Sequence, residues 1–348
     1  METGFITKKE NEQEFERYWR EFVTGQSLGP QYLYEFQQYL VAYSGEALVA
    51  DESFVYIKAG LPVAIAFLPV EQRDGVNSIT SGGSYVIAPV WVADAKNEQV
   101  VCDRIDEIAS QNQCMKVMLR RDPFESDRVA YNQFIQYGYL DTSLLGYAVD
   151  CKNPDMRRNH QRAIRKIQAD KAFAIEIFDA KNVTFETHEQ YRELHHKCAG
   201  KVTRSKATYE LQFEMIKNSN AILVGLKKDQ RFIAFTSFSY LGNKALSFSA
   251  ADDPEFDQLP LYHWINAAAI ENLASRGIEE IDMGQPLTTS TQFLYYPDDK
   301  QKNIALFKTG FAGRYLMQFQ AVKYFDKKIF FEEAEEFTKK YQIDGYEQ

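Results

Sequence analysis

A cluster of basic side chains in the middle of the chain has the spacing needed to hold phosphate groups. Residues 157–166 read RRNHQRAIRK and have the periodicity of a helix. Arg158, Arg162 and Arg165 share one face of such a helix, because residues three and four apart are neighbours on its surface. This face can hold phosphates, either of a tRNA acceptor end or of a nucleotide-linked substrate. A solvated helix that balances an otherwise acidic surface explains the pattern equally well.

A carboxylate at the end of an apolar segment is a second candidate. Residues 278–283 read IEEIDM and are typical of a buried strand that ends at Asp282. Strand ends border ligand crevices in open α/β sheets, so Asp282 can orient an incoming amine or bind its ammonium form. The alternative is a structural carboxylate that caps the following turn through backbone N–H groups.

Three further side chains can contribute to a pocket near that crevice. His263 falls in the first turn of a helix predicted at 260–275, where it can act as a general base near neutral pH. A packed or exposed histidine is the simpler interpretation. Tyr295 and Tyr296, together with Phe293, can wall an acyl or sugar pocket, or they can anchor a loop on the core.

Composition limits the classes of function. The 348 residues carry a formal net charge of −9, with 45% hydrophobic and 26% charged residues. This is the balance of a globular protein, and the length suits two domains. The acidic charge argues against broad nucleic-acid binding and against a DNA-binding protein, because both need a basic footprint.

Cysteine usage and hydropathy indicate a cytoplasmic protein. The four cysteines are scattered and form no CxxC pair, so we expect neither a disulfide framework nor a structural zinc site. No stretch approaches the roughly 20 apolar residues of a membrane span, and the N-terminal residues contain no apolar run like that of a signal peptide. We also expect no catalytic metal and no bound organic cofactor.

Hydrophobic periodicity and turn signals predict a similar order of elements in each half. In the first half, helices are predicted at 11–23, 30–43, 97–111 and 124–136, and strands at 53–58, 61–70, 77–81, 115–119 and 140–149. In the second half, helices are predicted at 156–169, 185–199, 208–218, 260–275, 301–310 and 327–341, and strands at 221–227, 231–241, 244–250, 278–283 and 315–323.

The repeated order predicts an α/β protein built from two similar domains. Each half has paired helices, a three-strand antiparallel meander, and then a helix, a strand, a helix and a strand. Such an order suits a mixed sheet with helices on both faces. It resembles the order of the acetyltransferase superfamily known as GNAT. We therefore predict tandem GNAT-like domains at 1–150 and 151–348, with the active site in the second.

Four segments of the second half occur together in one family. RRNHQRAIRK at 157–166 is similar to a helix with the pattern R-x-x-I-R-K-A, and IDMG at 281–284 to a strand end with the pattern F-D-L-G. The apolar helix LPLYHWINAAAIENLASRG precedes that strand, and LFKTGF at 306–311 is similar to the pattern F-K-x-x-F. With the doubled order of elements, the chain resembles the Fem-type aminoacyl transferases that extend peptidoglycan precursors.

The resemblance implies an acyltransferase and assigns it a catalytic lysine. Lys308 would stabilise the oxyanion of a tetrahedral intermediate as a compact cation, and Phe307 beside it would shape the site. An exposed lysine on a helix is the alternative. Asp282 would position the acceptor amine, which belongs to a cell-wall precursor, a peptide or an amino sugar.

The segment that precedes the helix at 260–275 bears on the acyl donor. Acetyl-CoA enzymes of the superfamily place a glycine-rich turn there, whose N–H groups cradle pyrophosphate. Residues 250–257 instead read AADDPEFD, with four carboxylates and no glycine, and would repel it. Aminoacyl-tRNA or another acyl carrier is therefore favoured by elimination. A CoA-dependent N-acyltransferase and a non-catalytic GNAT-like binding module remain the alternatives.

Overall fold

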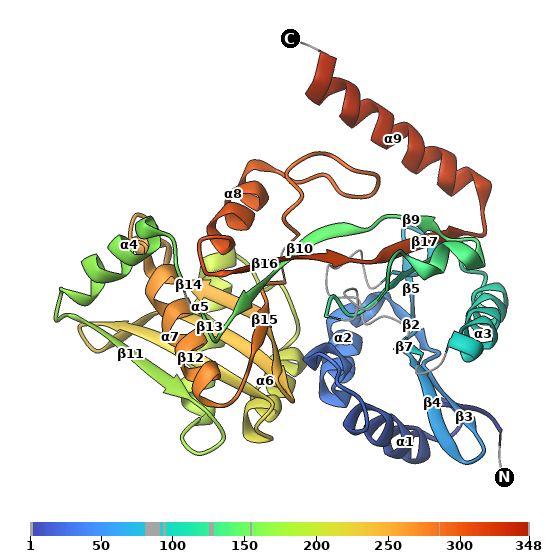
Figure 1. Cartoon of the computed structure of the whole chain (residues 1–348), viewed down its shortest axis with the longest axis horizontal. Coiled ribbons are helices and arrows are strands. Elements are labelled where there is room, and N and C mark those ends of the chain that lie inside the picture. The colour runs from blue at the N-terminus through green and yellow to red at the C-terminus, as the bar shows by residue number, and fades with distance from the viewer. Residues whose placement is uncertain are drawn as a thin grey trace.

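The computed structural model describes residues 3–80, 91–92, 95–124, 129–153, 155–284 and 286–346. Two lobes lie side by side and are bridged by long strands near the top of the view in Figure 1. Within the described residues, no helix combines the length and the apolar character that a membrane crossing requires.

The lobe on the left of Figure 1 is built around a seven-stranded sheet with the order β11-β12-β13-β14-β15-β10-β16. Neighbouring strands are antiparallel except for β14 and β15, which run parallel. The strands are β10 Leu144–Asp150, β11 Phe173–Phe178, β12 Ala221–Lys228, β13 Arg231–Leu241, β14 Lys244–Asp252, β15 Glu280–Asp282 and β16 Gly313–Gln318.

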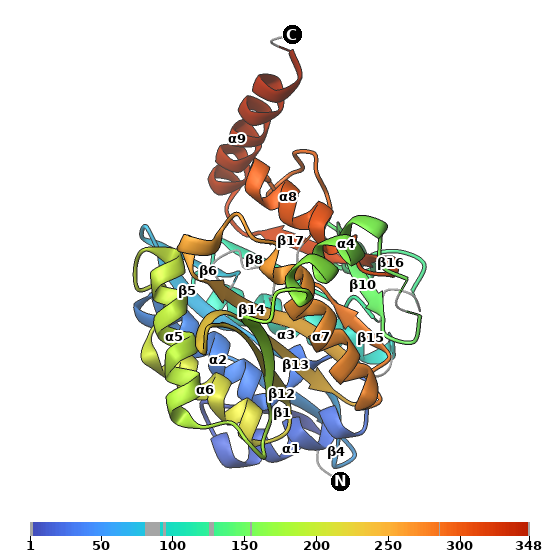
Figure 2. The same ribbon diagram turned by 90° about the vertical axis from the view of Figure 1, so that its left-hand side faces the viewer.

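Helices cover both faces of this sheet, as Figure 2 shows. On β12, Leu223 packs with the α5 and α6 side, whereas its neighbours Ile222 and Val224 pack with the α7 side. The continuous apolar run of β12 follows from this burial on two faces. The helices of the lobe are α4 Arg158–Gln168, α5 Phe185–Ala199, α6 Lys206–Lys217, α7 Leu261–Ser275 and α8 Asp299–Lys308.

The other lobe contains two smaller sheets. One has the order β1-β3-β4-β7 and the other the order β2-β5-β6-β8-β17-β9. The strands are β1 Gly4–Thr7, β2 Leu48–Asp51, β3 Phe54–Lys58, β4 Leu61–Ala66, β5 Pro69–Arg73, β6 Val76–Ile79, β7 Trp91–Val92, β8 Lys116–Arg120, β9 Leu140–Asp141 and β17 Gln320–Tyr324. The helices are α1 Glu12–Thr24, α2 Tyr34–Ser44 and α3 Glu98–Gln111. The mixed α/β class predicted from the sequence is confirmed.

The two lobes exchange strands across the boundary predicted at residue 150. β10 precedes that boundary but lies between β15 and β16 of the seven-stranded sheet. β17 comes from the end of the chain but lies between β8 and β9 of the first lobe. Only Phe319 separates β16 from β17, so one continuous extended segment serves both sheets. Hydrophobic patterning finds such strands but does not say which sheet each one joins.

A shared hydrophobic core joins the lobes. Phe36 and Tyr39 of α2 each lie 4.8 Å, between ring centroids, from Phe248 of β14. The same cluster of buried residues extends to Tyr191 on α5 and Tyr209 on α6. The lobes therefore pack together through apolar side chains as well as through the exchanged strands.

Some predicted elements differ in the structure. In place of a helix at 124–136, the structure has only the 3₁₀ turn Gln133–Tyr137, which ends at Gly138 with φ of +81°. Residues 125–128 of that prediction lie outside the described residues. Ile135 and Tyr131 are exposed, so the apolar pattern there does not mark a buried helix face. The last helix, α9 Lys327–Tyr346, is longer than predicted and extends away from both lobes (Figure 1).

Candidate active site

Lys308 is the last residue of α8 and lies where the lobes meet. The helix begins at a capping box, in which Asp298 and Gln301 satisfy each other's backbone N–H groups. The half-buried Lys308 side chain turns toward the sheet, where its ammonium donates a hydrogen bond to the carbonyl oxygen of Met283. Burial lowers the pKa of Lys308 to about 8, against the opposing pull of the Asp282 carboxylate. The structure thus contradicts the alternative of a surface lysine.

Asp282 is buried at the end of β15, with 2% of its surface exposed. One carboxylate oxygen accepts the Gly284 N–H at 2.8 Å, as expected for a residue that caps the following turn. Burial raises the pKa of Asp282, whereas Arg120, the Gly284 N–H and Lys308 act to lower it. Gly284 has φ of +72°, and an added Cβ would lie 2.9 Å from the Ser247 carbonyl oxygen, so glycine is required at this turn.

Arg120, at the end of β8, is a member of the site that sequence reasoning missed. Its side chain is buried, and its Nη2 lies 3.9 Å from the second Asp282 carboxylate oxygen. Burial lowers the pKa of the guanidinium, and the neighbouring Asp282 raises it. The available signal was a charged residue that directly follows the apolar run Val117–Leu119. Only the tertiary structure brings that strand end to β15.

The site lies where two parallel strands separate. β14 and β15 are paired only from Lys244–Glu280 to Leu246–Asp282. β14 then continues to Asp252, whereas β15 ends. Asp282, Met283 and Gly284 therefore lie at the point of divergence, as expected for a ligand site at strand ends.

Phe307 belongs to a cluster of rings behind Lys308. Its ring centroid lies 5.2 Å from that of His160 and 4.9 Å from that of His263. His160 Nε2 donates to the Phe307 carbonyl oxygen at 2.9 Å, and the same oxygen also accepts the Gly310 N–H at 2.9 Å. Burial lowers the pKa of both histidines. Gly310 leaves room for the His160 ring, because an added Cβ would lie 2.0 Å from it.

A cavity of about 530 Å³ opens beside this cluster. Phe307 and His263 line it together with Tyr262, Lys300 and Asn303. The structure therefore brings His263 close to Phe307, and its role as a general base stays a prediction. Its position in the first turn of α7 accounts for this proximity.

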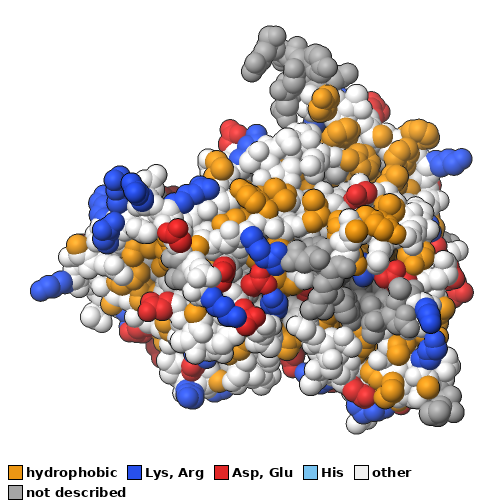
Figure 3. Space-filling view, viewed as in Figure 1, with side chains coloured by type: hydrophobic (Ala, Val, Ile, Leu, Met, Phe, Trp, Pro, Cys, Tyr) orange, Lys and Arg blue, Asp and Glu red, His pale blue; other side chains and the backbone are white. Residues whose placement is uncertain are grey.

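The three arginines predicted to bind phosphate lie on α4. Arg158, Arg162 and Arg165 are exposed, and blue side chains gather over this helix at the upper left of Figure 3. Within the described part of the chain, none of the three forms an ion pair with a carboxylate. α4 packs on the lobe through its opposite face, which carries His160, Ile164 and Ile167. Phosphate binding by this face stays a prediction.

The side chains of the predicted aromatic wall form packing contacts. The Phe293 ring centroid lies 5.9 Å from that of Phe337 on α9, and Lys340 of α9 lies 4.0 Å from the centre of the Tyr296 ring. Tyr295 is buried. These contacts agree with the alternative of an anchored loop, and a pocket wall at these residues stays a prediction.

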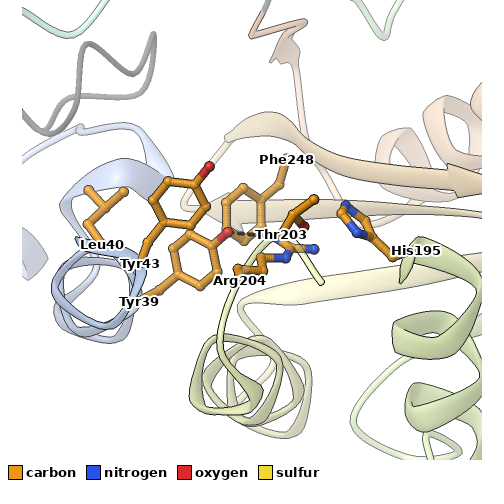
Figure 4. A pocket seen from close by; sticks show the side chains of 7 residues that line it. All are labelled: Tyr39, Leu40, Tyr43, His195, Thr203, Arg204 and Phe248. Atoms are coloured by element: carbon orange, nitrogen blue, oxygen red, sulfur yellow. Dashed lines mark hydrogen bonds between the residues drawn. The ribbon is translucent and has the colours of Figure 1, made fainter. Parts of the chain in front are cut away.

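A second cavity, of about 350 Å³, lies between α2 and β14 (Figure 4). Its walls are Tyr39, Leu40, Tyr43, His195, Thr203, Arg204 and Phe248. Phe248 protrudes into this region because a β-bulge on β14 leaves it without a partner on β13. The cavity therefore combines residues of both lobes.

Arg204 is a cation in this cavity with only neutral partners. It donates to the Tyr39 hydroxyl at 2.5 Å, the Tyr191 hydroxyl at 3.0 Å and the Ser249 hydroxyl at 3.1 Å. Within the described residues it forms no ion pair. Burial and, to a smaller extent, the charge of Arg204 lower the pKa of His195 to about 4. Sequence reasoning did not find Arg204, because a lone arginine between two helices carries no local signal.

Comparisons with known proteins agree with this arrangement. The acetyltransferase (GNAT) domain family matches residues 154–290. The crystal structure of FemX superposes with a TM-score of 0.63 at 11% identity, over 95% of this chain and 99% of that one. The chain has the tandem GNAT fold of the Fem-type proteins. Its second half carries an acyltransferase domain, so the predicted enzyme class is confirmed.

Two other solved structures have the same fold. The C-terminal domain of a putative lysylphosphatidylglycerol synthetase from Agrobacterium fabrum has a TM-score of 0.62 at 13% identity, over 92% of this chain and 96% of that one. A tandem GNAT protein from the clavulanic acid biosynthesis pathway has a TM-score of 0.52 at 13% identity, over 93% and 98%. No curated protein sequence matches the chain.

Proposed function

We propose that the chain transfers an acyl group, in the favoured case an aminoacyl group, to the amine of an acceptor that carries an anionic group. A cell-wall precursor, a peptide or an amino sugar phosphate would meet this description. The observation that carries the proposal is the Lys308 ammonium, held at the point where β14 and β15 separate. A half-buried cation in that position suits a reaction that develops negative charge on oxygen.

The chemistry needs little from the protein beyond positioning and charge. The neutral amine attacks the carbonyl carbon of the donor ester, a C–N bond forms, and the carbonyl oxygen becomes an oxyanion. Lys308 stabilises this oxyanion, and the C–O bond to the donor then breaks. The proton lost by the amine ends on the departing oxygen. With its pKa lowered to about 8, Lys308 is a better hydrogen-bond donor than an ordinary lysine.

The surroundings of Arg204 support the proposal that the acceptor carries an anionic group. A half-buried guanidinium whose partners are all neutral hydroxyl groups keeps an uncompensated charge. A carboxylate or phosphate of the acceptor would supply the missing partner. The cavity lies between α2 and β14, and the acceptor's anionic group would bind there.

The turn before α7 supports an ester donor over CoA. Pro260 precedes the helix, and the N–H groups of Leu261 and His263 donate within the turn, to the carbonyl oxygens of Leu259 and Pro260. These N–H groups are therefore occupied, whereas a pyrophosphate cradle needs them free. The four carboxylates of residues 250–257 repel a pyrophosphate less strongly than their number implies, because Lys197 and Arg231 pair with Asp253. Aminoacyl-tRNA remains the favoured donor, and the exposed arginines of α4 suit its phosphates.

Transfer assays with defined donors test the proposal. Purified protein is incubated with a uridine-diphosphate-linked peptidoglycan precursor and either ¹⁴C-aminoacyl-tRNA from total tRNA or ¹⁴C-acetyl-CoA. We expect label to pass from aminoacyl-tRNA to the acceptor. Label from acetyl-CoA alone would instead establish the second candidate, a CoA-dependent N-acyltransferase, which the GNAT domain match favours. Precursor that stays unlabelled with every donor, although it binds the protein, would contradict both.

Arg204→Met tests the anionic acceptor site. We expect KM for the acceptor to rise by about tenfold or more with a small change in kcat, because a charge-assisted contact is lost from binding. The matched control is Lys206→Met, which removes a nearby cation whose side chain is 62% exposed. Equal KM values for both variants and the wild-type protein would contradict the assignment.

A further inference from the structure

Arg120 brings a positive charge from the first lobe to the catalytic strand of the second. It is 5% exposed, and its Nη2 lies 3.9 Å from an Asp282 carboxylate oxygen. The two residues belong to different sheets, because Arg120 ends β8 and Asp282 ends β15. The contact therefore forms only when the lobes are docked.

The two oxygens of Asp282 have different partners, and Lys308 pairs with neither. One oxygen accepts the Gly284 N–H, and the other faces Arg120. The Lys308 ammonium instead donates to the carbonyl oxygen of Met283, the residue after Asp282. Within the described residues, Lys308 forms no ion pair. The charges of Lys308 and Asp282 act on each other, and the two would pair if no other cation competed for the carboxylate.

We propose that Arg120 is a positioning residue for Lys308, because it holds the Asp282 carboxylate and so leaves the ammonium free for the substrate. The role of Arg120 in catalysis rests on the proposed function. It adds a residue of the first lobe to the active site, and it explains why the contact spans the two lobes.

The other titratable groups near Arg120 do not take the place of Asp282 as the carboxylate that links Arg120 to Lys308. Asp122 also faces Arg120, but its oxygens accept the N–H groups of Gly29 at 2.7 Å and Phe124 at 2.8 Å. Tyr32 contributes only a hydroxyl. Asp282 is thus the carboxylate that lies between Arg120 and Lys308.

Loss of Arg120 has a defined electrostatic consequence. Asp282 would keep its buried position, and Lys308 would be its nearest remaining cation. The two would form an ion pair, which favours the charged form of the lysine. The pKa of Lys308, which burial holds at about 8 in the native protein, would therefore rise by about one unit or more.

Titration of Lys308 by NMR tests this without any substrate. The ¹³Cε shift of Lys308 is followed against pH in ¹³C-lysine-labelled protein, with its signal assigned by its loss in Lys308→Met. The variants are Arg120→Met and Arg120→Gln, the second retaining a hydrogen-bonding amide in case the first fails to fold. The control is Arg121→Met, because Arg121 is equally buried but pairs with Glu98 inside the first lobe.

We expect the pKa of Lys308 to rise in both Arg120 variants and to stay at its native value in Arg121→Met. The rise should vanish when Asp282→Asn is combined with Arg120→Gln, because no carboxylate is then left to pair. An unchanged or lower pKa in the Arg120 variants, or an equal rise in the control, would overturn the inference. Absence of transferase activity would reject the proposed function while leaving this titration result intact.

Discussion

At the scale of single residues, the site depends on charges held where solvent is scarce. Lys308 would be an ordinary basic residue if it faced water, but burial at the end of α8 lowers its pKa, and its ammonium reaches the carbonyl oxygen of Met283 just after β15. Asp282 and Arg120 complete the group and are both buried. Removal of one buried charge from such a group affects the others strongly, because little water screens them.

The lowered pKa of Lys308 predicts how activity depends on pH. The ammonium form is the active one, so kcat should fall as pH rises through about 8, where Lys308 loses its proton. The measurement is kcat between pH 6 and 10 at saturating acceptor. The control variant Lys302→Met, which changes a lysine on the same helix, should show the same fall in kcat above about pH 8 as the native protein. A kcat that stays level up to pH 10 would show that the charge of Lys308 is not needed.

At the scale of elements, β17 ties the end of the chain to the first lobe. It lies between β8 and β9, and the side chains of Ala321 and Val322 are fully buried. The extended segment that contains β16 and β17 thus connects the edge of the seven-stranded sheet to β8, the strand that ends at Arg120. Damage to β17 should affect both the stability and the site.

Val322→Asp should destabilise the protein by about 3 kcal/mol or more, because it buries an unpaired charge in the middle of a sheet. Val49→Asp is the matched control, since Val49 lies on β2, the edge strand of the same sheet, and is 54% exposed. That variant should stay within about 0.5 kcal/mol of the native protein. Urea denaturation measures both, and equal losses would mean that β17 is not part of the sheet.

At the scale of the whole molecule, the two lobes form one cooperative unit. They exchange β10 and β17, and a single hydrophobic cluster runs from α1 and α2 to α5 and α6. The candidate active site uses the same contacts, because Arg120 and Asp282 come from different lobes. The proposed catalytic group is therefore assembled by the docking of the lobes.

Hydrogen exchange should show this cooperativity. Peptides from β8 in the first lobe and from β13 in the second should have opening free energies that agree within about 1 kcal/mol, because neither sheet can open alone. Peptide-level mass spectrometry after timed exchange provides the values. Two well-separated values would indicate lobes that unfold independently, contrary to the exchange of strands.

The sequence was informative about local elements and about chemistry carried by short motifs. The helices at 185–199 and 261–275 follow from their periodicity, and the Phe307–Lys308 pair followed from the family resemblance. Long-range contacts could not be predicted, because no local pattern links β8 to β15 or α2 to Arg204. Strand β11 was missed as well, since most of its side chains are only half-buried and give a weak alternation.

The most direct test of the account is the turnover number of Lys308→Met with the donor and acceptor that the native protein uses. We predict that kcat falls by about 100-fold or more, as for the loss of one oxyanion donor, while KM for the acceptor changes little and Lys302→Met stays at the native rate. A folded Lys308→Met protein that keeps more than about a tenth of the native kcat would contradict the claim that this ammonium stabilises the transition state.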